Sequence, residues 1–331
     1  MNYRLWSIPL LLMAGGAQAS PAALEGVAQR AVATQVKLCG PTHIGFFGQV
    51  TVVTDNGGGT LYHRVANGPW QSSPFKLNSA HSVLQLPNGR WLINDTNNNR
   101  MIEADRLDGT GRTVILDELG GIKLNRPHDQ ILDPETGDVY LIDGSRTLFR
   151  FKTLEGKVES WKFRHPEEMD YARSLSWFDG KVHIIHSSRG EVLRVDDFDK
   201  RELTRFASPR PVSGPASSGT PYRDFPAGAL STTGLVLNDV EYFDGWYYGT
   251  NFFSPRYAKG GDTGPARLIR WKNWDDFKAG RWEDRSDRLP VSKTPVIPYY
   301  MTVAEDGLHI AYFGDQGCDN GGFVIIRPDE P

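Results

Sequence analysis

One short unit that recurs along this 331-residue chain constrains its fold more than any other feature. In the copy HSVLQLPNGRWLINDTNNNRMIEAD, which starts at His81, apolar residues alternate with polar ones on either side of a Pro-Asn-Gly turn. Alternation with a period of two around a glycine-containing turn is the pattern of a β-hairpin, and a third strand follows. A single copy would specify only a hairpin, whereas regular repetition specifies a closed array of small sheets.

Further copies of the unit start near Thr42, His128, Arg173, Asn238 and, most weakly, Tyr300. The intervals from His81 to His128 and from His128 to Arg173 lie near the period of about 40 to 50 residues that is typical of propeller blades. Long helical patterns are absent apart from 22–36. We therefore predict an all-β, six-bladed β-propeller of four-stranded antiparallel blades with a short N-terminal helix. A bent array of smaller β domains is the alternative.

The first 19 residues predict export. A basic residue, an apolar run and small residues ending at Ala19 form the pattern of a cleaved signal peptide. We divide the chain into this segment (1–19), an N-terminal segment (20–41) and the propeller (42–328), with insertions at 208–228 and 251–265. No later stretch reaches the roughly 20 apolar residues that a membrane span needs. We expect a periplasmic or secreted monomer without membrane insertion.

Composition narrows the range of partners. The formal net charge of −3 provides no basic surface for nucleic acid, so we expect a small-molecule substrate or ligand. The two cysteines, Cys39 and Cys318, lie near the two ends of the predicted propeller. In an oxidising compartment an isolated pair favours a disulfide over two buried thiols. A bridge between these residues would join the first blade to the last and fasten the ring.

The blade sequences also resemble known families. LPNGRWLINDTNNNRMIEAD resembles the repeat of NHL-type propellers, and RPHDQILDPETGDVYLID is similar to blades of the six-bladed gluconolactonases, paraoxonases and strictosidine-synthase-like proteins. The resemblance covers most of 42–328 at the level of blade pattern. It implies the fold but leaves the function open, because these families include lactonases, lyases, sulfotransferases and binding modules.

The predicted ring places polar residues at one face of its central channel. The inner strands start at His81, His128, Arg173, Asn238 and Tyr300, and the second strands end at Asp95, Asp143, His186 and Asn251. For Asp95 and Asp143 we favour a structural role in which they accept backbone N–H groups of a neighbouring turn. For His81, His128 and Arg173 we favour a functional site, because polar groups that converge at a channel mouth are costly to desolvate without a ligand.

We expect substrate contacts from two sources. Tyr300, His186 and Asn251 belong to the predicted channel face. The insertion after Asn251 supplies four more side chains for stacking and anion contacts, namely Phe252, Phe253, Arg256 and Tyr257.

Three chemistries fit such a face. The resemblance to gluconolactonases and paraoxonases implies one divalent metal, calcium, held by Asp129, Asn238 and Asp239, although the first-blade acidic ligand of those families is missing. Zinc is less favoured, since His81 and His128 lack a third histidine at an equivalent position. Without a metal, either histidine would act as a base or nucleophile and Arg173 would stabilise an anion.

The sequence thus favours an exported hydrolase or lyase that acts on a small lactone, ester or sugar-derived substrate at the channel mouth. A non-catalytic periplasmic binding propeller is the alternative. A histidine-based sulfotransferase-like enzyme is a further one.

Overall fold

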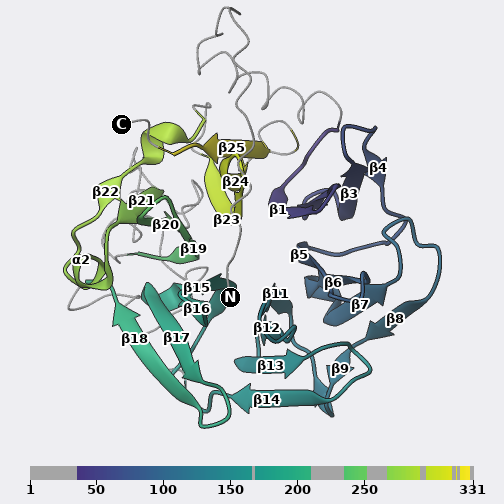
Figure 1. Cartoon of the computed structure of the whole chain (residues 1–331), viewed down its shortest axis with the longest axis horizontal. Coiled ribbons are helices and arrows are strands. Elements are labelled where there is room, and N and C mark those ends of the chain that lie inside the picture. Colours follow the sequence, from purple (N-terminus) through teal and green to yellow (C-terminus); the bar gives the residue numbers. More distant parts are fainter. Residues whose placement is uncertain are drawn as a thin grey trace, which may run out of the picture.

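Six antiparallel β-sheets surround a central axis as the blades of a propeller in the computed structural model, with the first and last blades side by side (Figure 1). The structure describes residues 36–165, 168–209, 235–251, 267–290, 296–314, 318 and 321–328. The predicted all-β, six-bladed fold is confirmed. The predicted signal peptide, 22–35 of the predicted N-terminal helix and nearly all of both insertions lie outside the described residues.

Each blade starts with its innermost strand and proceeds outward. Blade 1 contains β1 (Pro41–Phe47), β2 (Val50–Asp55), β3 (Thr60–Val65) and β4 (Gln71–Ser72). Blade 2 contains β5 (Ala80–Gln85), β6 (Trp91–Asp95), β7 (Arg100–Ala104) and β8 (Thr113–Leu116). Blade 3 contains β11 (Pro127–Leu132), β12 (Val139–Asp143), β13 (Thr147–Phe151) and β14 (Val158–Lys162).

The remaining blades follow the same plan. Blade 4 contains β15 (Ala172–Phe178), β16 (Lys181–His186), β17 (Glu191–Asp197) and β18 (Glu202–Ala207). Blade 5 contains β19 (Leu237–Phe243), β20 (Trp246–Asn251), β21 (Leu268–Trp271) and β22 (Glu283–Asp284). Blade 6 has three strands among the described residues, β23 (Ile297–Ala304), β24 (Gly307–Phe313) and β25 (Gly322–Ile326).

Short elements connect strands within and between the blades. The hairpin of β9 (Glu118–Leu119) and β10 (Ile122–Lys123) and the 3-10 turn η6 (Ser286–Arg288) lie between blades. The 3-10 turns η1 (Thr96–Asn98) and η2 (Ser187–Arg189) and the helix α2 (Trp274–Lys278) lie within blades 2, 4 and 5. Asn273 caps α2 by accepting a hydrogen bond from the backbone N–H of Asp276. No described helix is long and apolar enough to cross a membrane.

The hydrophobic core consists of six apolar clusters, one between each pair of adjacent blades. Strand β12 shows how one strand contributes to two of them: Val139 and Leu141 face blade 2, whereas Tyr140 and Ile142 face blade 4. Successive side chains of a strand point to opposite faces, so a strand with both faces buried becomes a continuous apolar run. The sixth cluster joins Ile44 of blade 1 to Phe323 of blade 6 and closes the ring.

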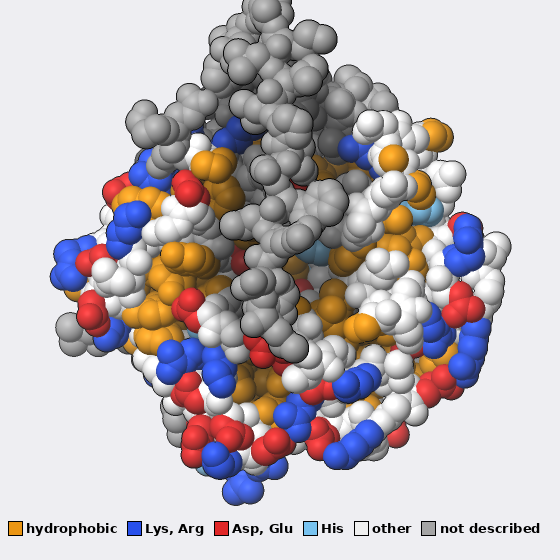
Figure 2. All heavy atoms as spheres, in the orientation of Figure 1, with side chains coloured by type: hydrophobic (Ala, Val, Ile, Leu, Met, Phe, Trp, Pro, Cys, Tyr) orange, Lys and Arg blue, Asp and Glu red, His pale blue; other side chains and the backbone are white. Residues whose placement is uncertain are grey.

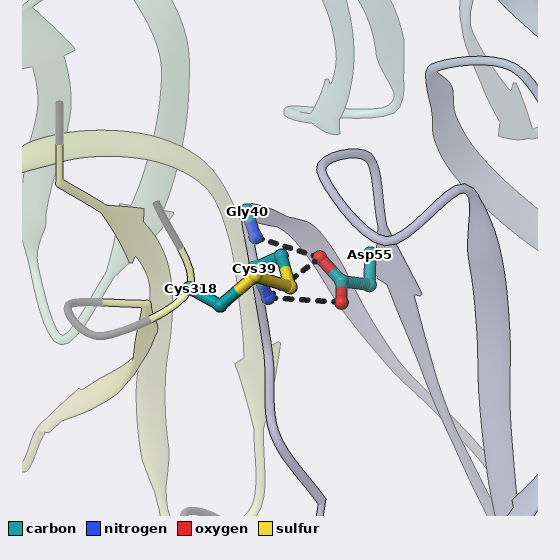
Figure 3. Close-up of a disulfide and its surroundings, with 4 residues drawn as sticks. All are labelled: Cys39, Gly40, Asp55 and Cys318. Carbon is teal, nitrogen blue, oxygen red and sulfur yellow. Dashed lines mark hydrogen bonds between the residues drawn. A yellow bond between two sulfur atoms is a disulfide. The ribbon is translucent and has the colours of Figure 1, made fainter. Parts of the chain in front are cut away.

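A disulfide fastens the same seam, as the sequence predicted. Cys39 lies just before β1, and Cys318 lies between β24 and β25, 279 residues later (Figure 3). The carboxylate of Asp55, at the end of β2, accepts hydrogen bonds from the backbone N–H groups of Cys39 and Gly40, at 2.9 and 2.6 Å (Figure 3). The bridge is compatible with an extracellular location.

Four other blades repeat the contact that Asp55 makes. The last residue of the second strand accepts a backbone N–H from the loop that leads into the inner strand of its own blade: Asn78 to Asp95, Asn125 to Asp143, Asp170 to His186 and Val236 to Asn251. A buried N–H group needs such a partner. The structural role predicted for Asp95 and Asp143 is therefore present, and blades 4 and 5 fill the same position with an imidazole and an amide.

Loss of the disulfide should weaken the ring without unfolding it at room temperature, because the apolar cluster at the seam remains. The chain-entropy model gives an upper figure of about 5 kcal/mol for a loop of this length. We expect the Cys39→Ser/Cys318→Ser variant to lose a few kcal/mol of unfolding free energy in urea titrations, as should the reduced wild type. A reducing agent should leave the double variant unchanged, and an effect on it would contradict this account.

Candidate functional site

A β-bulge at the start of every inner strand positions the residues of the channel face. The pairing with the second strand shifts register in all six blades, and the unpaired residues are Thr42, His81 with Ser82, His128, Arg173, Asn238 and Tyr299 with Tyr300. A bulge leaves one extra residue out of the ladder and redirects its side chain. The polar residues that the sequence placed at inner-strand starts are therefore turned out of their sheets.

These bulges open onto a cavity of about 200 Å³. Its lining takes one residue from the bulge of blades 2, 3, 4 and 6, namely His81, His128, Arg173 and Tyr299. The residues two positions earlier in the same blades also line it, namely Ser79, Arg126, Tyr171 and Ile297, together with Asn56 and Phe313. A histidine side chain is visible near the centre of the face in Figure 2, whereas charged side chains gather along the outer edge.

His81 and His128 are adjacent and almost fully buried, with 4% and 1% of their surfaces exposed. Their ring centroids lie 4.7 Å apart and the ring planes are nearly perpendicular. The Nδ1 atom of His81 lies 2.6 Å from the carbonyl oxygen of Ser79. A carbonyl only accepts, so Nδ1 carries the proton of the neutral ring and Nε2 keeps its lone pair. No described residue bonds to this Nε2.

Both imidazoles are neutral at physiological pH. Burial, with smaller contributions from Arg173 and Arg126, lowers the pKa of His81 to about 3. The pKa of His128 is also well below its ordinary value, because of burial first and then of the neighbouring His81 and the same two arginines. Nε2 of His128 lies 2.8 Å from the hydroxyl of Tyr171. The cavity therefore holds an unprotonated ring nitrogen beside a tyrosine–histidine pair.

Arg173 is held by a chain of hydrogen bonds that crosses three blades. Its Nη1 donates to Oδ1 of Asn238 at 2.7 Å, and Nδ2 of Asn238 donates to the carbonyl of Pro298 at 2.7 Å. The guanidinium also lies over the rings of Tyr171 and Tyr299, at 5.7 and 5.3 Å. Its position is fixed, so it can offer positive charge to a ligand without reorganisation.

The three residues predicted to bind a metal do not fit a divalent cation. Asp129 accepts the backbone N–H of Leu175 at 2.8 Å, and Asp239 accepts that of Met301 at 2.7 Å. The amide oxygen of Asn238 accepts from Arg173, whose positive charge opposes a cation there. Among the described residues, no group of three or more histidine, cysteine, aspartate or glutamate side chains is arranged to hold a metal ion. We derive no chemistry through calcium or zinc.

The predicted substrate-binding residues fall into three groups. His186 and Asn251 are fully buried at the ends of β16 and β20, where they accept the backbone hydrogen bonds described above, and neither lines the cavity. Tyr300 donates its hydroxyl to the carbonyl of Arg173 at 2.6 Å, and its neighbour Tyr299 faces the cavity instead. The other four predicted substrate-binding residues lie outside the described residues, namely Phe252, Phe253, Arg256 and Tyr257.

Three residues that line the cavity were not predicted from the sequence, Arg126, Tyr171 and Tyr299. Arg126 and Tyr171 each stand two positions before a bulge residue, and a search for polar residues at that offset from His128 and Arg173 would have found them. Tyr299 was displaced by one position, because the bulge of blade 6 contains two tyrosines and the pattern does not show which one leaves the ladder.

Comparisons with known proteins find structures of similar fold but identify no family for this chain. No family model matches the chain, and no curated protein matches it. A catalytically inactive virginiamycin B lyase from Staphylococcus aureus, bound to quinupristin, superposes with a TM-score of 0.57 at 12% identity over 88% of this chain and 96% of that one.

Two further solved structures are about as similar. A proposed gluconolactonase matches with a TM-score of 0.56 at 9% identity over 88% of this chain and 90% of its own. A luciferin-regenerating enzyme matches with a TM-score of 0.55 at 14% identity over 88% of this chain and 92% of its own. At these identities the likeness shows a shared propeller fold alone.

The buried Asp129 should make stability depend on pH. Burial and the charge of Asp239 raise its pKa to about 8, so between about pH 4 and 8 the folded protein keeps a proton that the unfolded chain has lost. Raising the pH through this window therefore favours unfolding, by up to about 1.4 kcal/mol per pH unit for one group. We expect Asp129→Asn to flatten this slope and to be more stable than the wild type at pH 8.

Urea titrations at pH 5, 6.5 and 8 measure the effect. Asp287→Asn, at an exposed aspartate, is the matched control and should keep the wild-type slope. Equal slopes for Asp129→Asn and the wild type would contradict the assignment of this proton to Asp129.

Proposed function

We propose that this protein is an enzyme of the lyase class that acts on a small lactone, ester or sugar-derived molecule in the channel cavity. The observation that carries the proposal is the lone pair on Nε2 of His81. The carbonyl of Ser79 fixes the opposite nitrogen as the N–H, and no described residue uses Nε2. A neutral imidazole with one nitrogen held and the other available to substrate is a general base.

The cavity supplies the other parts of an elimination. Nε2 of His81 takes a proton from a carbon atom of the substrate, and the C–H electron pair forms a new C=C bond. The bond from the adjacent carbon to a leaving oxygen breaks, and that oxygen keeps the electron pair. The Tyr171 hydroxyl, hydrogen-bonded to His128, is positioned to protonate the leaving oxygen, and solvent later restores both protonation states. Arg173 stabilises the negative charge that develops on the substrate.

Three further facts support this choice. Among the described residues, the lining contains no serine–histidine–carboxylate arrangement and no carboxylate that would form a covalent intermediate. In the lyase that shares the fold, replacement of a histidine by alanine makes the protein catalytically inactive. The cavity is smaller than the roughly 300 to 1,000 Å³ of sites for drug-sized ligands, which suits a small substrate.

A hydrolase is the second candidate, and the likeness to a proposed gluconolactonase favours it. The same Nε2 would then take a proton from water, the resulting hydroxide would attack an ester or lactone carbonyl, and Arg173 would face the oxyanion. We also propose that the protein acts after export, because a disulfide at the seam suits an oxidising compartment.

Replacement of His81 should abolish turnover. General-base catalysis contributes about 10²- to 10⁴-fold, so we expect His81→Gln to lower kcat/KM by at least 100-fold. A panel of small lactones, esters and sugar acids, with products identified by mass spectrometry, measures this loss and separates elimination from hydrolysis, since elimination leaves a C=C bond. His309→Gln, outside the cavity and bonded to Asp306, is the matched control.

Either of two results would remove the proposal. If His81→Gln is as active as the wild type, the base is elsewhere. If the wild type binds compounds of the panel and converts none of them, the protein is a binding module.

The pH profile gives an independent test of the base. Because kcat/KM reports the free enzyme and the pKa of His81 there is about 3, the active neutral ring persists well below pH 6.5. We expect kcat/KM to be constant from about pH 7.5 down to 5, with circular dichroism confirming the fold at each pH. An acidic limb centred near pH 6.5 would contradict His81 as the base.

A further inference from the structure

Arg126 is a second arginine in the cavity, and its main-chain conformation is unusual. It precedes β11 with a φ of +50°, in the left-handed region that non-glycine residues rarely adopt. Its backbone N–H donates to Oδ1 of Asn99 at 2.9 Å, and its carbonyl accepts from the N–H of Gly144 at 3.2 Å. Only the backbone takes part in these bonds, so the turn itself gives no reason for an arginine side chain.

The guanidinium of Arg126 is not neutralised within the described structure. It forms no ion pair with a described residue, and its Nε is buried without a hydrogen-bond partner. A non-glycine residue in the left-handed region stores backbone strain, and such strain concentrates at ligand sites. A strained position that carries a charged group into a cavity is therefore better explained by a ligand than by the fold.

The described part of the cavity lining carries positive charge. Its ten residues include the guanidinium groups of Arg126 and Arg173, two neutral histidines and no carboxylate. Arg173 approaches from blade 4 and Arg126 from the loop before blade 3, so two positive groups from adjacent blades face one small space. Planar guanidinium groups match the geometry of a carboxylate, with which they form charge-assisted hydrogen bonds.

We propose that the cavity binds a small carboxylate, with Arg126 and Arg173 donating to its oxygens and the adjacent carbon next to Nε2 of His81. The inference rests on the proposed function for the reaction, but the binding of the carboxylate does not depend on turnover. The acid group stands beside the carbon that loses its proton, so the charge that develops in an elimination falls on the group that the two arginines hold.

A bound anion also accounts for how His81 acts as a base. Burial and the two arginines make its imidazole a weak base in the empty cavity. A carboxylate between the arginines offsets their charge and favours the protonated ring, which raises the pKa of His81 in the complex. The substrate thereby brings the base closer to the pKa at which proton transfer near neutral pH is efficient.

Paired ligands that differ only in charge test the proposal. Glycolate and its neutral amide, glycolamide, are titrated into the full chain while the histidine ring signals are followed by NMR. We expect glycolate to shift the signals of His81 and His128 and to bind at least tenfold more tightly than glycolamide. Arg126→Gln should lower the affinity for glycolate at least tenfold and leave that for glycolamide unchanged, whereas Arg126→Lys should recover part of the preference.

Arg146 provides the matched control. It has a positive φ of +66° like Arg126 but does not line the cavity, so Arg146→Gln should bind glycolate as the wild type does. Equal affinities for glycolate and glycolamide, or an undiminished preference in a folded Arg126→Gln variant, would overturn the proposal.

The two proposals fail separately. His81→Gln should retain the preference for glycolate over glycolamide, because the arginines remain. If it retains that preference and the wild type converts no substrate, the carboxylate site stands and the lyase assignment falls. If the wild type turns over neutral compounds and does not prefer glycolate, the reverse holds.

Discussion

Contact between adjacent blades is the interaction on which the rest of this structure depends. No blade buries both of its faces alone, so each sheet packs on two neighbours, and the six apolar clusters close into a ring. Closure needs the first and last blades to meet, and the seam contains an apolar cluster, the Cys39–Cys318 bridge and the carboxylate of Asp55. Only a closed ring brings the starts of six inner strands together around one channel.

The polar side chains at the channel are almost as buried as the core, so each needs a hydrogen-bond partner within the protein. Several of them find that partner in a neighbouring blade and thereby join the two blades. Asp129 accepts a backbone N–H of blade 4, Asp239 accepts one of blade 6, and Asn238 links Arg173 to Pro298. Residues whose chemistry suggests metal ligands are thereby engaged by N–H donors, while His81 keeps an available nitrogen. Hydrogen bonds rather than residue type separate the structural roles from the proposed catalytic role.

Much of the geometry of the candidate site was predictable from sequence, and the differences have physical causes. His81, His128 and Arg173 were predicted to meet at one face, and they do, because equal positions in repeated units occupy equal positions around the axis. His186 was assigned to the substrate, but it fills the role that Asp55, Asp95 and Asp143 have in other blades. Alignment of the units identified the position correctly, and only the hydrogen bond shows which way its ring nitrogens are used.

The sequence by itself determined the blade count, the order of strands and the polar residues near each inner-strand start, because period and turn chemistry are local properties of the chain. It also indicated the seam disulfide, because a closed ring brings the first and last blades, and with them Cys39 and Cys318, together. Tertiary structure alone decided which of these polar residues face the cavity, since a bulge redirects one side chain and not its neighbour, as with Tyr299 and Tyr300. It also decided the charge of the site. Arg126 reaches the cavity through a left-handed turn, and His81 is neutral because it is buried. The position of Arg126 in the cavity and the burial of His81 both depend on blades that are distant in sequence.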